Sequence, residues 1–198
     1  MKRALKIGIA AYGAFAYFNY RNQMPGDTTP SLLIDLGATV TKLTGSAMTT
    51  SPDGRSQIAS REGLRYAVYL DSAGYKTAGI GHLLRPADGA LNVGDSVSDA
   101  QVQVWFNSDI SHAENTVNYY VNVPLTQNQF DALVSAVFNL GSALFKNSDG
   151  SETQLLQMLN SYKYNDAAKQ LLRFVHAGGV VVAGLETRRV SEYTQFMA

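Results

Sequence analysis

Three glycines constrain the stretch from Asp71 to His82 more tightly than any other part of the chain. They occupy positions 74, 79 and 81, and Tyr75, Thr77 and Ile80 lie among them in a nearly alternating pattern. Glycine supplies the backbone angles that short turns need, and alternating side chains are typical of strands. We therefore expect a small hairpin or meander in this stretch.

The residues after position 97 favour helices instead. Ser98 with Gln101, and Thr126 with Gln129, have the spacing of capping boxes, in which two side chains satisfy the free amide groups at the start of a helix. Apolar residues follow each box at intervals of three to four, as one face of a helix requires. Further helices are expected over 153–162, 165–175 and 185–196. The fold class is therefore α+β, with a small β-sheet lobe, a larger helical lobe and a cleft between them.

The first 24 residues, which we call the head, resemble a secretory signal. The head has four basic side chains and no acidic one, and its twelve residues from Ile7 to Phe18 carry no charge. Secretory signals have about 7–15 apolar residues after a basic start, whereas a stable transmembrane helix needs about 20. We expect residues 1–24 to form an apolar, signal-anchor-like helix. A cleavable signal, cut near Ala14-Phe15-Ala16, and a helix packed on protein remain alternatives.

Composition changes across residues 25–56, which are rich in Thr, Ser, Gly and Pro. Pro25, Pro30 and Pro52 interrupt regular structure, so we expect this segment to be a tether that leads to a folded domain at 57–198. Its Thr-rich part, 39–50, contains β-branched residues that favour strands. A strand there, or docking of this part on the folded domain, remains an alternative.

Charge and cysteine content exclude several classes of function. Sixteen Lys and Arg balance sixteen Asp and Glu, which removes the electrostatic basis for nucleic acid as the main partner. The chain has no cysteine, so disulfides, cysteine nucleophiles and thiolate metal sites are excluded. The histidines, at 82, 112 and 176, lack metal-ligand spacing, and we expect no metal and no cofactor.

Three oxygen-bearing side chains lie close together at the start of the expected folded domain. Glu62 precedes Asp71 by nine residues, and Thr77 follows six residues later. A facing pair of carboxylates is the minimum for glycoside hydrolysis, because one must donate a proton while the other stays ionised. Two acids at this spacing are also common on solvated surfaces. From the residues alone, a catalytic pair and a surface pair both remain open.

A resemblance to a known family extends this reading. Residues 62–82, EGLRYAVYLDSAGYKTAGIGH, resemble in residue type and spacing the catalytic signature of the T-even type phage lysozymes, glycoside hydrolase family 24. Residues 124–141 are similar to the helix in the core of that family's larger lobe, and residues 184–192 to its C-terminal Arg-Arg segment. The resemblance covers about 57–198. The apolar head resembles the signal-anchor-release endolysins of the same family.

The resemblance implies a lysozyme-like fold and an endolysin that lyses the host cell wall. Such a muramidase cleaves the β-1,4 bond between N-acetylmuramic acid and N-acetylglucosamine by an inverting acid/base mechanism. Glu62 would be the general acid, and Asp71 would stabilise the oxocarbenium-like transition state and, with Thr77, hold the attacking water. A virion-associated lysozyme or structural particle component, and a lytic transglycosylase, are the alternatives.

Further roles follow from the same resemblance. It implies that His82 forms a structural pair with Asp109 rather than a metal or acid-base site. Tyr75 would pack on a sugar ring, although ordinary packing is as common for a tyrosine in a strand.

Asn139 and Gly141, at the end of the central helix, would contact substrate near the cleft floor. Ending the helix is an equally good role for these two residues. The arginines at 188 and 189 either bind anionic wall components or, as we favour, pair with carboxylates of the helical lobe.

The expected partners are the glycan strands of bacterial peptidoglycan, with no nucleic acid. Residues 7–18 would associate transiently with the inner membrane. We expect a monomer that is exported to the host periplasm and tethered to the membrane before release, with the virion as the alternative location.

Overall fold

The computed structural model describes residues 47–71 and 73–198. The expected apolar head, 1–24, and residues 25–46 of the expected tether lie outside these residues. In the described part of the chain, no helix combines the length and the apolar character that crossing a membrane requires.

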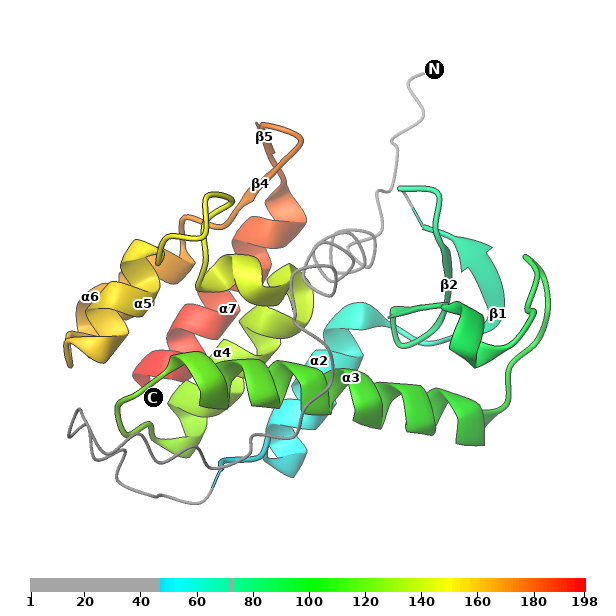
Figure 1. Ribbon diagram of the computed structural model, residues 1–198, viewed down its shortest axis with the longest axis horizontal. Helices are drawn as coiled ribbons and strands as arrows, with labels where there is room; N and C mark the ends of the chain where they lie inside the picture. Colours follow the sequence, from blue (N-terminus) through cyan, green and yellow to red (C-terminus); the bar gives the residue numbers. More distant parts are fainter. Residues whose placement is uncertain (1–46, 72) are drawn as a thin grey trace, which may run out of the picture.

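The described chain folds into a small sheet lobe and a larger helical lobe, which confirms the predicted α+β class (Figure 1). Its helices, in chain order, are α2 (Pro52–Glu62), α3 (Asp99–Tyr120), α4 (Gln127–Leu140), α5 (Gln154–Asn160), α6 (Tyr164–Leu171) and α7 (Ala183–Met197). Its strands are β1 (Arg65–Leu70), β2 (Lys76–Gly79), β3 (His82–Leu83), β4 (His176–Ala177) and β5 (Val180–Val181). Two 3-10 turns are η1 (Pro86–Asp88) and η2 (Gly141–Leu144).

The predicted meander forms an antiparallel sheet in the order β1-β2-β3. Tyr69 of β1 lies opposite Thr77 of β2, and Thr77 lies opposite Leu83 of β3. Gly79 and Gly81 both have positive φ, 63° and 71°, so glycine is required at the tight turn that joins β2 to β3. This turn brings the sheet back towards the end of α2.

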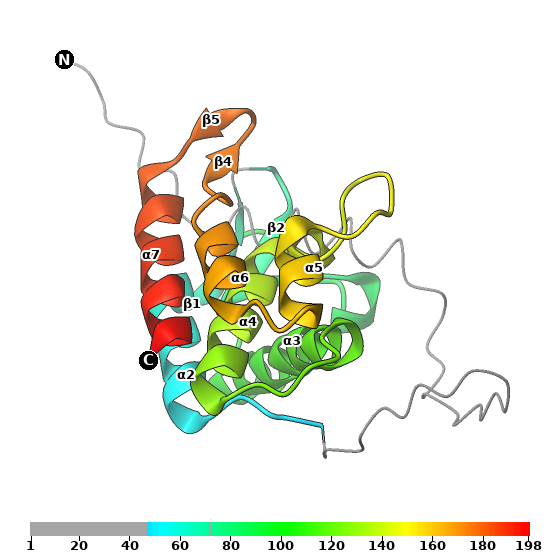
Figure 2. The same cartoon turned by 90° about the vertical axis from the view of Figure 1, so that its left-hand side faces the viewer.

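Helix α4 forms the centre of the helical lobe, and α2, α3 and α7 pack around it (Figure 2). Its side chains Phe130, Leu133 and Val134 are at most 1% exposed. The predicted capping box at its start is present, because Thr126 and Gln129 each accept a hydrogen bond from the backbone amide of the other. At the start of α3, half of the predicted capping box is present, because the Ser98 hydroxyl accepts a hydrogen bond from the Gln101 amide.

Several element boundaries differ from the predicted ones. The sequence predicts a break at Pro52, whereas Pro52 is the first residue of α2, where a helix has no use for the amide that proline lacks. Residues 52–56 of the expected tether therefore lie in a helix. The helix predicted over 165–175 ends at Leu171 instead, and the β4-β5 hairpin follows it, turning through Gly178 and Gly179 with positive φ.

The chain just before α2 docks on the helical lobe. The backbone N–H and C=O of Met48 both bond to the side chain of Asn118, at 3.1 and 2.9 Å. The Thr50 amide donates to the buried Glu114 carboxylate at 2.7 Å. The end of the Thr-rich stretch therefore docks on the folded domain, which is one of the two alternatives given for it above.

Candidate active site

Glu62 ends helix α2 at the junction between the two lobes. Gly63 follows with a φ of 74°, which lets the chain leave the helix and turn into β1. On the sheet side, Gly81 faces the carboxylate, and a Cβ atom added to this glycine would lie 3.5 Å from Glu62 Oε2. The side chain of Glu62 is only 2% exposed, so it lies inside this junction.

Arg188 of α7 contacts Glu62 from the helical side. Its Nη1 lies 2.5 Å from Glu62 Oε1, its Nε lies 3.1 Å from Glu192 Oε1, and its Nη2 donates to the carbonyl of Ser135. Burial disfavours the charged guanidinium, but the charges of Glu62 and Glu192 outweigh this effect, and the pKa of Arg188 is raised above its ordinary value. The preferred pairing of Arg188 with lobe carboxylates is thus present, but the sequence reasoning did not identify Glu62 as a partner.

Arg189 extends the buried network behind this pair. Its Nε lies 3.1 Å from Glu192 Oε2, and its Nη2 donates to Asn139 Oδ1 at 2.8 Å. Burial lowers the pKa of Arg189 to about 10, although the Glu192 charge acts against that shift. Asn139 is fully buried within the lobe, and Gly141, with a φ of 62°, ends α4. Both residues thus belong to the packed helical lobe, and contact of either residue with substrate stays a prediction.

Asp71 follows β1 directly, and its carboxylate is fixed by the turn that it begins. Oδ1 accepts hydrogen bonds from the amides of Ala73 and Tyr75, each at 2.9 Å. Oδ2 is buried and has no hydrogen-bond partner among the described residues. The carboxylate thus keeps one oxygen in place and leaves the other unengaged.

Thr77 is fully buried in β2, the middle strand. Its hydroxyl donates to the carbonyl of Tyr75 at 3.2 Å, so its oxygen keeps lone pairs for a further donor. Tyr75 itself is half-buried in the β1-β2 turn, where its backbone also accepts from the amide of Asp71. This turn therefore positions both Asp71 and Thr77.

Tyr69 lies close enough to both carboxylates to be affected by their charge. Burial raises the pKa of its hydroxyl, Arg65 lowers it, and the charges of Asp71 and Glu62 raise it again. Arg65 lies over the Tyr69 ring, 4.3 Å from its centroid. Tyr69 also lies opposite Thr77 in the sheet. It is therefore close to Thr77 as well as to the two carboxylates. Sequence reasoning missed Tyr69, although its position between Glu62 and Asp71 in the signature could have identified it.

His82 and Asp109 are brought together as expected. His82 Nδ1 lies 2.8 Å from Asp109 Oδ2, and the imidazole stacks on Trp105 with ring centroids 4.7 Å apart. Asp88, which sequence reasoning missed, lies 3.3 Å from His82 Nε2 and accepts from Trp105 Nε1. This cluster fastens the sheet lobe to α3. Within residues 47–71 and 73–198, no group of three or more His, Asp or Glu side chains has the arrangement of a metal site.

The chain is similar to known proteins over most of the described part. Residues 59–192 match the family model of phage lysozyme. The endolysin of Acyrthosiphon pisum secondary endosymbiont phage 1 is 34% identical over 153 residues, which span 75% of this chain and 98% of that protein. The SAR-endolysin of Bacteriophage PS119 is 31% identical over 147 residues, 74% of this chain and 81% of that protein. A crystal structure of a P22 lysozyme mutant superposes with a TM-score of 0.64 at 30% identity, and the match covers 76% of this chain and 99% of that one.

Proposed function

Because this chain belongs to the phage lysozyme family and is a peptidoglycan hydrolase, we propose that Glu62, Asp71 and Thr77 perform its chemistry. The reaction is hydrolysis of the β-1,4 bond between N-acetylmuramic acid and N-acetylglucosamine, with inversion at the anomeric carbon. The observation that carries this proposal is the state of the Asp71 carboxylate, with Oδ1 held by two amides and Oδ2 buried and unengaged.

Glu62 is the general acid of the proposed mechanism. When protonated, it donates its proton to the glycosidic oxygen as the bond to the anomeric carbon breaks. Transfer leaves a carboxylate in a site with little solvent. Arg188, 2.5 Å away, stabilises that negative charge as it forms. Arg188 therefore stabilises the transition state, in which Glu62 is becoming negative, more than the ground state, in which Glu62 is protonated.

Asp71 and Thr77 act on the attacking water. Asp71 Oδ2 accepts one water hydrogen, and the Thr77 oxygen accepts the other, because the Thr77 hydrogen is already donated to Tyr75. Two acceptors turn a lone pair of the water oxygen towards the anomeric carbon. Asp71 then takes the proton as the new C–O bond forms, and its charge opposes the positive charge that develops on the sugar. Tyr75, at the turn beside them, is the residue that we propose packs on the sugar ring.

Product analysis tests the mechanism. Purified peptidoglycan is digested with the wild-type chain, with Glu62→Gln and with the control Glu186→Gln, which alters an exposed glutamate on the same helix as Arg188. We expect reducing muramic ends from the wild type and the control, initially in the α-anomeric form, and almost none from Glu62→Gln. Ends in the 1,6-anhydro form would instead assign the chain to the transglycosylases.

We further propose that the head tethers the enzyme to the inner membrane before release into the periplasm. Similarity to a SAR-endolysin and the uncharged run 7–18 support this. Cell fractionation should find the whole chain with the inner membrane, and removal of residues 1–24 should abolish that association. A whole chain that never enters the membrane fraction would contradict the proposal.

We also propose that the folded domain begins near Met48 and acts as a monomer. Docking of residues 48–51 on the helical lobe supports the boundary, and it shortens the proposed tether to 25–47. One chain supplies Glu62, Asp71, Thr77 and Arg188, which supports a monomer. Light scattering of the active protein should give the mass of one chain, and a stable dimer would contradict it.

A further inference from the structure

The chain leaves helix α5 through a tyrosine in a backbone conformation that suits glycine. Tyr162 has a φ of 61°, and no other non-glycine residue in the described part of the chain has a positive φ. Its amide donates to the carbonyl of Leu159, and the amide of Lys163 donates to that of Met158, both at 2.9 Å. These bonds form the usual left-handed helix ending, where glycine or asparagine is preferred because a Cβ atom is strained there.

The side chain of Tyr162 does not compensate for this strain by packing in the core. Tyr162 is 65% exposed. Its aromatic neighbour is Tyr164, whose centroid lies 6.4 Å away with the ring planes at 85°. Tyr164 is fixed, because its hydroxyl donates to the carbonyl of Pro124 at 2.7 Å. A strained backbone that presents an exposed ring beside a fixed one points to binding rather than to stability.

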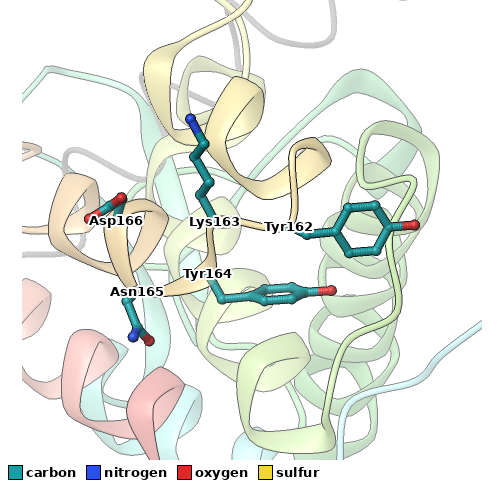
Figure 3. A pocket seen from close by; sticks show the side chains of 5 residues that line it. All are labelled: Tyr162, Lys163, Tyr164, Asn165 and Asp166. Carbon is teal, nitrogen blue, oxygen red and sulfur yellow. The ribbon is translucent and has the colours of Figure 1, made fainter.

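The two rings belong to a shallow pocket at the turn between α5 and α6. Figure 3 shows both rings extending to the same side of the turn, and the other residues that line the pocket are Lys163, Asn165 and Asp166. The ammonium of Lys163 and the carboxylate of Asp166 have opposite charges. Asp166 also forms an ion pair with Lys169, at 3.3 Å. The pocket therefore offers apolar ring surface and hydrogen-bonding groups without a strong net charge.

We propose that this pocket is an accessory binding site for the glycan strand of peptidoglycan. The apolar face of an N-acetylated sugar stacks on the Tyr162 ring, and Lys163 and Asn165 bond to its hydroxyl and acetamido groups. This inference rests on the peptidoglycan hydrolase function. Figure 1 places α5 and α6 at the opposite end of the molecule from the sheet, so the pocket is separate from the candidate active site. A polymeric strand can occupy both sites, which keeps the enzyme on the wall between cleavages.

The test uses the whole chain with Glu62→Gln, so that the strands stay intact during the measurement. Binding to glycan strands freed of stem peptides by an amidase is compared for Tyr162→Asn, Tyr162→Phe and the control Tyr119→Asn, which alters another exposed tyrosine. Tyr162→Asn should weaken binding about two- to tenfold, the range expected for one ring contact. Tyr162→Phe and the control should bind as the parent does. Thermal unfolding of Tyr162→Asn should occur at or above the parent temperature, because asparagine tolerates this conformation.

Two results would overturn the accessory site. One is equal binding of Tyr162→Asn and the parent to the freed strands. The other is a loss seen only with whole walls that carry stem peptides or attached polymers, which would assign the pocket to another ligand. The proposed mechanism fails separately, when the wild-type chain releases no reducing ends whatever the Tyr162 variants do.

Discussion

Arg188, in the C-terminal helix α7, lies 2.5 Å from the Glu62 carboxylate at the end of α2, and both side chains are only 2% exposed. The same guanidinium lies against Glu192 and the Ser135 carbonyl, so one side chain joins α2, α4 and α7. The candidate catalytic acid is therefore positioned by the helical lobe, although it lies at the edge of the sheet lobe.

Arg188→Met should reduce both stability and activity. It removes the buried guanidinium that pairs with Glu192 and bonds to the Ser135 carbonyl, and removing one member of a buried ion pair costs about 3–5 kcal/mol. Activity should fall at least tenfold, because the carboxylate formed after proton transfer loses its stabilising charge. Urea unfolding and the rate of peptidoglycan hydrolysis measure the two effects. Lys169→Met, which breaks an exposed pair, should change stability by less than about 1 kcal/mol. Full activity in Arg188→Met would refute the role given to this pair.

Substitution of Thr77 separates its hydroxyl from its shape. Thr77→Val keeps the volume but loses the oxygen that accepts from water, and hydrolysis should slow about 100-fold. Stability should fall by only about 1 kcal/mol, for the lost bond to Tyr75. Thr77→Ser retains the hydroxyl and should keep most of the activity. Initial rates and thermal unfolding of the two variants provide the comparison, and equal rates for valine and serine would argue against a water-holding role.

Tyr69 should make the folded state less stable in alkali. Burial, with the charges of Asp71 and Glu62, raises the pKa of its hydroxyl above the unfolded value of about 10, despite the opposing charge of Arg65. Above pH 10 the unfolded chain therefore releases a tyrosine proton that the folded chain keeps, so the contribution of Tyr69 to stability falls as the pH rises.

Tyr69→Phe should make this decline shallower without abolishing it. The pKa values of Tyr66 and Tyr164 are also raised, chiefly by desolvation, so they contribute in the same direction, whereas the lowered pKa of Arg189 contributes in the opposite one. Urea midpoints between pH 9 and 11.5 would be compared for the two proteins at steps of about half a unit. Parallel curves would show that Tyr69 does not contribute.

Truncation should locate the start of the folded domain. A chain that begins at residue 47 keeps every bond of the docked segment, whereas one that begins at residue 52 leaves Glu114 and Asp131 without the amides of Thr50 and Ser51. It also loses Ser51 as the cap of α2. The longer truncation should lower the free energy of unfolding by about 2–4 kcal/mol relative to the shorter one. Equal unfolding midpoints for the two chains would restore residue 57 as the boundary.

Local patterns in the sequence predicted the local structure well. The glycines after Asp71 and the capping box at Thr126 correspond to a real meander and a real helix start, since both depend on neighbouring residues only. The break predicted at Pro52 is wrong, because a proline that breaks a helix and a proline that begins one look alike in sequence. The predicted end of the next helix at 175 is wrong for a related reason. The glycines at 178 and 179 form the turn of a hairpin, and the apolar pattern does not indicate that hairpin.

Contacts between distant segments were predicted only where the family resemblance supplied them. The resemblance predicts the pairing of His82 with Asp109. It does not predict that Asp88 also contacts His82, because Asp88 lies in a 3-10 turn that has no periodic pattern. Pairing of Arg188 with Glu62 joins residues 126 positions apart, and no spacing rule connects side chains at such a distance. The hydrogen bond from Arg189 to Asn139 likewise joins two different helices, α7 and α4.

The contact between Arg188 and Glu62 also makes the candidate site depend on a second, distant segment of the chain. Ribosomes make the Glu62 segment before α7, so a nascent chain lacks the arginine that contacts its candidate acid until α7 has been made. Any chain that ends before α7, through premature termination or proteolysis, carries the whole signature 62–82 and still lacks that partner. The complete signature is therefore not sufficient for the candidate site, because the cation that contacts its acid belongs to a helix more than a hundred residues further along the chain.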